Sequence, residues 1–250
     1  MPTPALPPSL GFVYAVTNAH VIQQGACTIR INTRDGGTAI LELRPQNWVC
    51  SSSDDLAVYP LPWSDEFAAE PGISTKDFMT PEIMEEYNFG MGDLVVTIGR
   101  FINHEGKQRN MPSARFGYLA QLPHEPIQYH VLNKTYFQES FLADLRSVGG
   151  YSGSPVFLVP DPNLKRGGGR RVAVMVQDNW VLGVDWGHIL DWQPIYDEKR
   201  CPVHNRWQVQ WNTGMMGIVP IWKLMDLLND EALKKHRAEV EAKHTKPKSD

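Results

Sequence analysis

Short runs of hydrophobic residues recur along most of the chain, and many of them alternate with polar positions as half-buried β-strands do. Turn-forming segments such as TRDGG and SSSDD separate these runs. Many short strands in two groups predict an all-β protein, built as two β-barrels or as a sandwich. The predicted strands cover residues 12–17, 27–32, 38–43, 56–61, 93–99, 114–120, 127–132, 139–143, 155–159, 171–176, 180–186 and 215–220.

The stretch between the two groups of strands has a different pattern. Residues 62–91 are polar and are interrupted by Pro and Gly. One short helix is predicted at 81–86, because Thr80 can cap its start and Pro81 suits the first helical position. We interpret this stretch as a linker between two β units.

The clearest helical pattern lies near the C-terminus. After Pro220, apolar residues recur at the spacing of one helix face, at Ile221, Leu224, Met225 and Leu228. Beyond Asn229 the apolar face gives way to alternating charges and a tail that is expected to fray. The predicted division is an N-terminal β-barrel at 1–61, a linker at 62–91, a C-terminal β-barrel at 92–220, and a helix with its tail at 221–250.

The composition argues against several classes of function. The 250 residues are 42% hydrophobic and 21% charged, which is typical of a globular protein with a sizeable core. The formal net charge of −4 provides no general attraction to nucleic acid or to an anionic membrane. Cys27, Cys50 and Cys201 form no disulfide pattern, and Cys201 with His204 lacks a second ligand pair for zinc. We therefore expect no metal or other cofactor and no nucleic-acid or membrane partner.

The N-terminal sequence bears on the cellular location. MPTPALPPSL has neither the basic start nor the apolar helix of a signal peptide. No apolar segment approaches the ~18 residues that a membrane-spanning helix needs. These features predict a cytoplasmic protein, and they leave its oligomeric state open.

Three segments contain residues suited to acyl transfer: AVTNAH at 15–20, DDLAVYPL at 54–61 and RSVGGYSGSPVF at 146–157. His20 could act as the base, Asp55 could orient it, and Ser152 could be the nucleophile. Taken singly, each has an ordinary explanation, as a surface histidine, a turn aspartate or a serine in a glycine turn. Their order disfavours the α/β-hydrolases, in which the serine comes first and the histidine last.

Residues beside Asp55 and Ser152 offer a candidate oxyanion hole and a second candidate acid. The N–H groups of Gly150 and Ser152 are candidates for an oxyanion hole, since the surrounding glycines let a substrate backbone approach closely. Asp54 is the alternative acid to Asp55.

The segments VTNAHVI, DDLAVYPL, GDLVVTIG and GGYSGSPVF resemble, in this order, the blocks of chymotrypsin-like (trypsin-like) serine proteases. The resemblance covers about residues 12–228 and is greatest to the bacterial Deg proteases and the glutamyl endopeptidases. SGSPVF and VLGVDWG resemble the glutamyl endopeptidase branch in particular. TGMMGIVPIWKLMDLL resembles the last strand and the C-terminal helix of the family.

The resemblance implies two perpendicular six-stranded antiparallel barrels with the active site between them. His20 and Asp55 would come from the first barrel and Ser152 from the second, in a serine endopeptidase that acts on peptides or proteins. The family has about two strands before VTNAH, whereas about a dozen residues precede it here. We therefore expect either a shortened start or an incomplete first barrel.

The family register also suggests residues that bind substrate. Arg146 and Ser147 fall at the wall and base of the primary pocket, and Asp185, Trp186 and Gly187 fall on the strand that lines the cleft. Arg146 would favour an acidic side chain before the scissile bond, unless it turns outward or pairs with a nearby aspartate. Glutamyl endopeptidases carry a histidine where Asp185 stands, which argues against a glutamate preference.

Two other functions fit the same residues. One is a binding module with a protease fold that holds a peptide or a partner without turnover. The other is an acyl hydrolase that uses the same triad on small esters. Loss of peptide hydrolysis on His20→Ala would exclude the first, and a comparison of peptide with ester substrates would separate the second.

Overall fold

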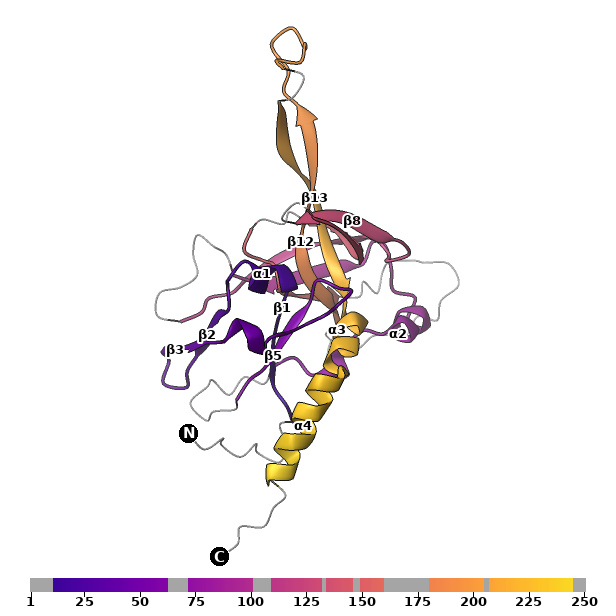
Figure 1. Ribbon diagram of the computed structural model, residues 1–250. Helices are drawn as coiled ribbons and strands as arrows, with labels where there is room; N and C mark the ends of the chain where they lie inside the picture. Colours follow the sequence, from indigo (N-terminus) through magenta and orange to yellow (C-terminus); the bar gives the residue numbers. More distant parts are fainter. Residues whose placement is uncertain are drawn as a thin grey trace, which may run out of the picture.

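The computed structural model describes residues 11–62, 72–100, 109–131, 134–145, 149–159, 180–204 and 207–244. Within these ranges the chain is mostly β-strand and ends in helices, which confirms the predicted fold class (Figure 1). The strand predicted at 171–176 lies outside the described residues.

The described part of the N-terminal β unit forms two small antiparallel sheets and no closed barrel. One sheet has the strand order β1-β5-β4, and the other pairs β2 with β3. The strands are β1 Tyr14–Thr17, β2 Thr28–Asn32, β3 Thr38–Glu42, β4 Val49–Cys50 and β5 Ala57–Pro60. Among the described residues this unit therefore differs from the closed six-stranded barrel that the resemblance implies.

The C-terminal β unit is a closed six-stranded barrel with the strand order β10-β13-β12-β11-β6-β7. All neighbouring strands of the barrel run antiparallel. The strands are β6 Leu94–Gly99, β7 Ser113–Gln121, β10 Phe141–Asp144, β11 Pro155–Val159, β12 Trp180–Pro194 and β13 Gln208–Pro220. A further hairpin of β8 Pro126–Val131 and β9 Lys134–Glu139 forms a separate sheet.

Strands β12 and β13 are much longer than the sequence pattern predicted. They remain paired as far as Pro194 and Gln208, and this hairpin projects away from the rest of the molecule (Figure 1). Trp192, Trp207 and Trp211 are exposed along it. Residues 207–212, WQVQWN, alternate apolar and polar positions as a strand does, so this sequence signal could have predicted the extension of β13.

The segment between the two β units contains the predicted short helix. Helix α2 spans Pro81–Glu86, and the Thr80 hydroxyl accepts a hydrogen bond from the Ile83 N–H at 3.3 Å. A 3₁₀ turn at Thr75–Asp77 comes earlier, and a second such turn lies at Pro45–Asn47 in the first unit. The Met79 N–H then bonds to the Val181 carbonyl, so this segment is attached to the barrel.

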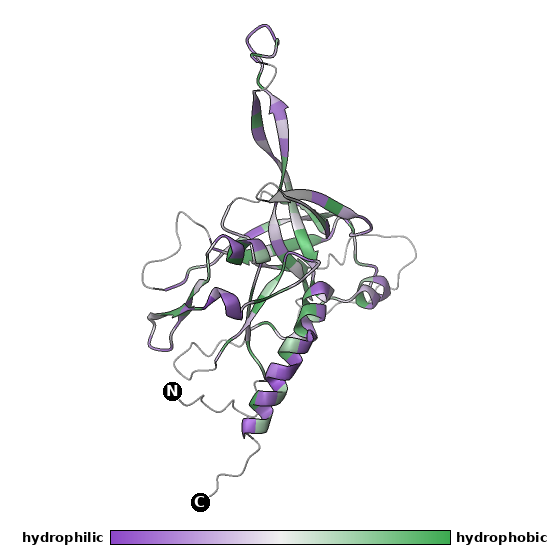
Figure 2. Cartoon of the chain, viewed as in Figure 1, coloured by the Kyte–Doolittle hydropathy of each residue, from purple (hydrophilic) through white to green (hydrophobic). Residues whose placement is uncertain are grey.

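Two C-terminal helices pack beside the open first unit, α3 at Ile221–Leu228 and α4 at Glu231–His244. Hydrophobic residues along α3 give way to hydrophilic ones along α4 (Figure 2). Leu233 of α4 is nonetheless buried, and Arg237 donates to the Tyr14 hydroxyl of β1 at 3.0 Å. The helices thus cover part of the sheet that carries the first candidate site residues.

One large cluster of buried residues connects the two units. Leu56 and Val58 of the first unit belong to the same buried cluster as the barrel residues Leu158 and Ile218 and the helix residue Leu224. Each fully buried side chain of this size contributes about 1.5–3 kcal/mol of hydrophobic stabilisation. The shared core holds the first unit against the barrel, although its own sheets do not close.

Candidate active site

His20 and Asp55 are brought together by the pairing of β1 with β5. Thr17 at the end of β1 lies opposite Ala57 at the start of β5. His20 follows in a short helix, α1 Ala19–Gln23, which was not among the predicted elements. Five residues are too few to show a helical period, which is why the sequence did not reveal this turn.

The His20 ring and the Asp55 carboxylate form a tight hydrogen-bonded pair. His20 Nδ1 lies 2.6 Å from Asp55 Oδ2, and the backbone N–H of His20 donates to Asp55 Oδ1 at 2.9 Å. Asp55 is only 5% exposed. Since an ionised carboxylate only accepts hydrogen bonds, Nδ1 is the donor. In the neutral imidazole Nε2 can then accept a proton from another group.

The structure distinguishes Asp55 from its neighbour Asp54. Asp55 contacts His20, and its carbonyl accepts a hydrogen bond from the Asn18 side chain at 2.9 Å. The carboxylate of Asp54 instead accepts from the Ser53 hydroxyl at 2.7 Å and from Gln138 at 2.9 Å. Asp55 is therefore the carboxylate placed to orient the imidazole.

Ser152 lies in a turn just before β11. It is half-buried, and Gly150 and Gly153 beside it both have positive φ, 98° and 87°. Tyr151 is buried, contacts the Ser113 hydroxyl, and lies under the Arg115 guanidinium at 4.8 Å. Glycine adopts such angles without strain, so this turn suits the pattern GGYSG.

The Ser152 turn packs directly on the end of β1. A Cβ atom at Gly153 would lie 3.0 Å from the Cα of Thr17, three residues before His20. The Gly153 N–H also donates to the Asp185 carbonyl at 2.8 Å. Among the described residues His20 makes no hydrogen bond to Ser152. Hydrogen bonds of this kind are often long in a free enzyme and shorten when substrate binds.

Replacing Gly153 tests this close approach. We expect Gly153→Ala to lower the free energy of unfolding by about 2–5 kcal/mol, because it adds both backbone strain and a clash with Thr17. Urea denaturation would measure the change. Gly149→Ala is the matched control, since a Cβ there meets nothing within 4 Å. Equal stability of the two variants would contradict the described packing.

The predicted substrate-binding strand is largely buried. Asp185 is 0% exposed, and the Trp186 indole is buried and donates to the Ser140 hydroxyl at 2.7 Å. Gly187 has a φ of 145° and donates its N–H to Asp185 Oδ1 at 2.8 Å. A substrate role for these three residues stays a prediction. Arg146 and Ser147 lie outside the described residues.

Asp185 is an unusual group to find beside His20. Its Oδ2 atom is buried and has no hydrogen-bond partner among the described residues. Burial raises the pKa of this carboxyl from 3.8 to about 7, while the Gly187 N–H and the charge of His20 act in the opposite direction. The carboxyl therefore changes charge near neutral pH.

This shift predicts how stability depends on pH. Between about pH 4 and pH 7 the folded protein keeps the Asp185 proton and the unfolded chain releases it. The free energy of unfolding should therefore fall as the pH rises through this range, by up to about 4 kcal/mol, and then level off.

Urea unfolding of the wild type and of Asp185→Asn from pH 4 to pH 8 would measure this fall. Asparagine keeps the acceptor for the Gly187 N–H but does not titrate, so the variant should gain stability relative to the wild type as the pH rises. Parallel curves for the two proteins would contradict the assignment to Asp185.

Two residues that matter to this site were not identified from the sequence: Asn18 and Gln138. Both are buried and bond to the main chain of Asp55. Asn18 lies inside the TNAH segment and could have been suspected, whereas Gln138 lies 83 residues from Asp55 with no sequence signal.

The described residues contain no group of three or more His, Cys, Asp or Glu that could hold a metal ion. None of the described helices is long and apolar enough to cross a membrane.

A closed barrel beside an open β unit, with the two candidate loops meeting between them, is consistent with the chymotrypsin-like double-barrel fold. No protein-family model matches the sequence, and no curated protein sequence matches it. Among solved structures, the chain is similar to the crystal structure of the MamO protease domain from Magnetospirillum magneticum in its apo form. The alignment covers 88% of this chain and 84% of that one, with 14% identity and a TM-score of 0.47. Similarity at this level assigns no activity, so the functional argument rests on the site itself.

Proposed function

We propose that the protein is a serine endopeptidase with His20, Asp55 and Ser152 as its catalytic residues and a peptide or protein as its substrate. The observation that carries the proposal is the partly buried contact of 2.6 Å between His20 and Asp55, made beside the Ser152 turn. The resemblance of the VTNAHVI, DDLAVYPL and GGYSGSPVF segments to Deg proteases and glutamyl endopeptidases supports the same assignment.

The proposed reaction proceeds through an acyl-enzyme. Ser152 Oγ attacks the scissile carbonyl carbon while His20 Nε2 takes the hydroxyl proton. The N–H groups of Gly150 and Ser152 stabilise the oxyanion that forms. His20 then gives the proton to the leaving amine as the C–N bond breaks. Water repeats the sequence on the ester and releases the acid product and free Ser152.

Asp55 has two roles in this mechanism. It keeps the proton of the neutral imidazole on Nδ1, so that Nε2 is the basic nitrogen, and it stabilises the imidazolium once Nε2 is protonated. The backbone bond from the His20 N–H to Asp55 Oδ1 helps to hold the carboxylate beside the imidazole.

Hydrolysis of a denatured protein substrate tests the proposal. Wild-type protein should produce fragments that mass spectrometry detects, and His20→Ala should produce none above background. Fragments formed equally by both proteins would sink the proposal. Comparing kcat/KM for a peptide with kcat/KM for a small ester of the same acyl group would show whether peptide bonds are the preferred substrate.

A peptide-binding module without turnover is the second candidate. The absence of a His20–Ser152 hydrogen bond among the described residues, together with the open first unit, favours this alternative. It predicts that a peptide binds with equal affinity to the wild type and to Ser152→Ala and is recovered intact from both.

A further inference from the structure

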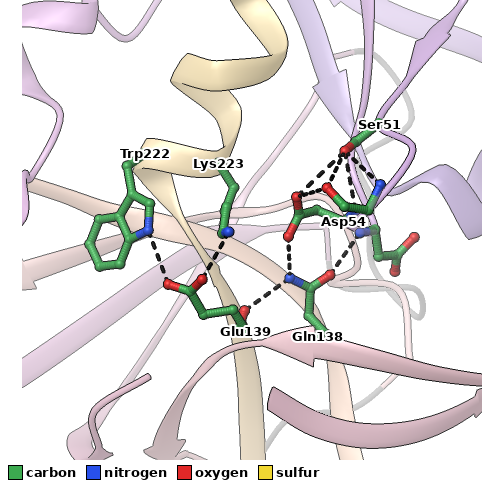
Figure 3. Close-up of polar contacts among 8 residues, drawn as sticks. Ser51, Asp54, Gln138, Glu139, Trp222 and Lys223 are labelled. Atoms are coloured by element: carbon green, nitrogen blue, oxygen red, sulfur yellow. Dashed lines mark hydrogen bonds and ion pairs between the residues drawn. The ribbon is translucent and has the colours of Figure 1, made fainter. Parts of the chain in front are cut away.

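Gln138, at the end of β9, connects the second β unit to the loop that carries Asp55. Its side chain is 1% exposed. Oε1 accepts a hydrogen bond from the Asp55 N–H at 2.8 Å, and Nε2 donates to Asp54 Oδ1 and to the Glu139 carbonyl, both at 2.9 Å (Figure 3). One amide therefore holds both aspartates of this loop.

The chemistry of the contact requires an amide. The group must accept from one N–H and donate to a carboxylate within the same few ångströms, in a position closed to water. Glutamine provides both an acceptor and donors without adding charge. An apolar side chain would leave the Asp55 N–H unpaired, and an ionised carboxylate would repel Asp54.

The next residue, Glu139, contacts the C-terminal helix α3. Glu139 accepts from the Trp222 indole at 3.1 Å and forms an ion pair with Lys223 at 2.8 Å (Figure 3). The hydrogen bond to Glu139 raises the pKa of Lys223. These contacts involve the Glu139 side chain, whereas Gln138 reaches the Asp54–Asp55 loop through its own amide.

Asp55 is held from two directions. Asn18 and His20 bind its carbonyl and its carboxylate from the first unit, whereas Gln138 binds its N–H from the second. The strands described for the first unit do not close into a barrel around this loop. The contact from Gln138 supplies a restraint that a closed barrel would otherwise provide.

We propose that Gln138 is a positioning residue for the proposed catalysis. It holds the Asp54–Asp55 loop so that the Asp55 carboxylate meets His20 Nδ1. Its kinetic consequences rest on the proposed protease function, whereas its effect on the His20–Asp55 contact does not.

Gln138→Glu provides the sharpest test, because only the protonated carboxyl can replace both contacts. Its carbonyl oxygen then accepts from Asp55 and its hydroxyl donates to Asp54, and ionisation abolishes the second bond. The ratio of kcat/KM for the variant to that of the wild type should therefore fall about 100-fold as the pH rises through the titration of the introduced carboxyl. The fall should lie in kcat, with KM little changed.

Two further variants control this measurement. Gln138→Met lacks polar atoms and should lower kcat/KM about 100-fold at every pH. Lys223→Met removes the ion pair with Glu139 but leaves Gln138 in place, and it should retain nearly full activity. Circular dichroism at each pH would correct for unfolded protein. A pH-independent ratio for Gln138→Glu, or equal losses in Lys223→Met, would overturn the positioning role.

An NMR measurement separates this inference from the proposed function. The Nδ1 proton of His20, held at 2.6 Å from Asp55, should give a low-field resonance in the wild type. It should move upfield or disappear in Gln138→Met and persist in Lys223→Met. If the resonance changes in Gln138→Met and persists in Lys223→Met, while the wild type cleaves no peptide, the positioning role of Gln138 stands and the protease proposal fails. An unchanged resonance in Gln138→Met refutes the positioning role, whatever the activity.

Discussion

Ser152→Ala is expected to lower kcat for peptide hydrolysis about 10⁶-fold, because the remaining residues cannot form the acyl-enzyme. KM should change little, since the removed oxygen adds little to ground-state binding. Steady-state kinetics with a fluorogenic peptide would measure both values.

Ser154→Ala is the matched control for that variant. Ser154 lies two residues further along the same turn, and its buried side chain packs near Gly99 and away from solvent. Its hydroxyl has no part in the proposed mechanism, so the variant should keep kcat within about ten-fold. A similar loss in both variants would mean that the turn, and not the Ser152 hydroxyl, determines activity.

Asp55→Asn should lower kcat about 10⁴-fold at neutral pH. The amide of asparagine can donate to Nδ1 and so favour the imidazole tautomer that carries its proton on Nε2, which cannot accept the serine proton. Asn also lacks the charge that stabilises the imidazolium. The loss should be smaller than that for Ser152→Ala, because an intact nucleophile and oxyanion hole remain.

The neighbouring aspartate provides the comparison. Asp54→Asn keeps an oxygen that can accept from Gln138 and does not touch His20, so we expect less than about a ten-fold loss. Kinetics of the two variants side by side, with near-ultraviolet circular dichroism to confirm folding, would test this contrast. A larger loss in Asp54→Asn than in Asp55→Asn would reverse the assignment of the acid.

The sequence predicted the β character of the chain, α2 and the start of the C-terminal helix, because these depend on local patterns. Thr80 and Pro81 mark the start of α2 by known capping chemistry. The β-branched residues of LVVTIG likewise favour a strand. Such signals are contained within a few residues, so they can be read without the fold.

Other features depend on contacts between distant parts of the chain. Gln138 meets Asp55 across 83 residues, and Arg237 meets Tyr14 across 223. Helix α4 has a mostly charged sequence, yet its Leu233 is buried. These contacts hold the first unit, which carries His20, against the rest of the molecule, and no local sequence pattern predicted them.

The most direct test of the protease proposal is labelling with a fluorophosphonate probe, which forms a covalent bond with an activated serine. The wild type should gain one probe by intact mass, and peptide mapping should locate it on Ser152. Ser152→Ala and His20→Ala should remain unlabelled under the same conditions. An unmodified wild type, or equal labelling of the wild type and Ser152→Ala, would contradict the proposed catalytic role of Ser152.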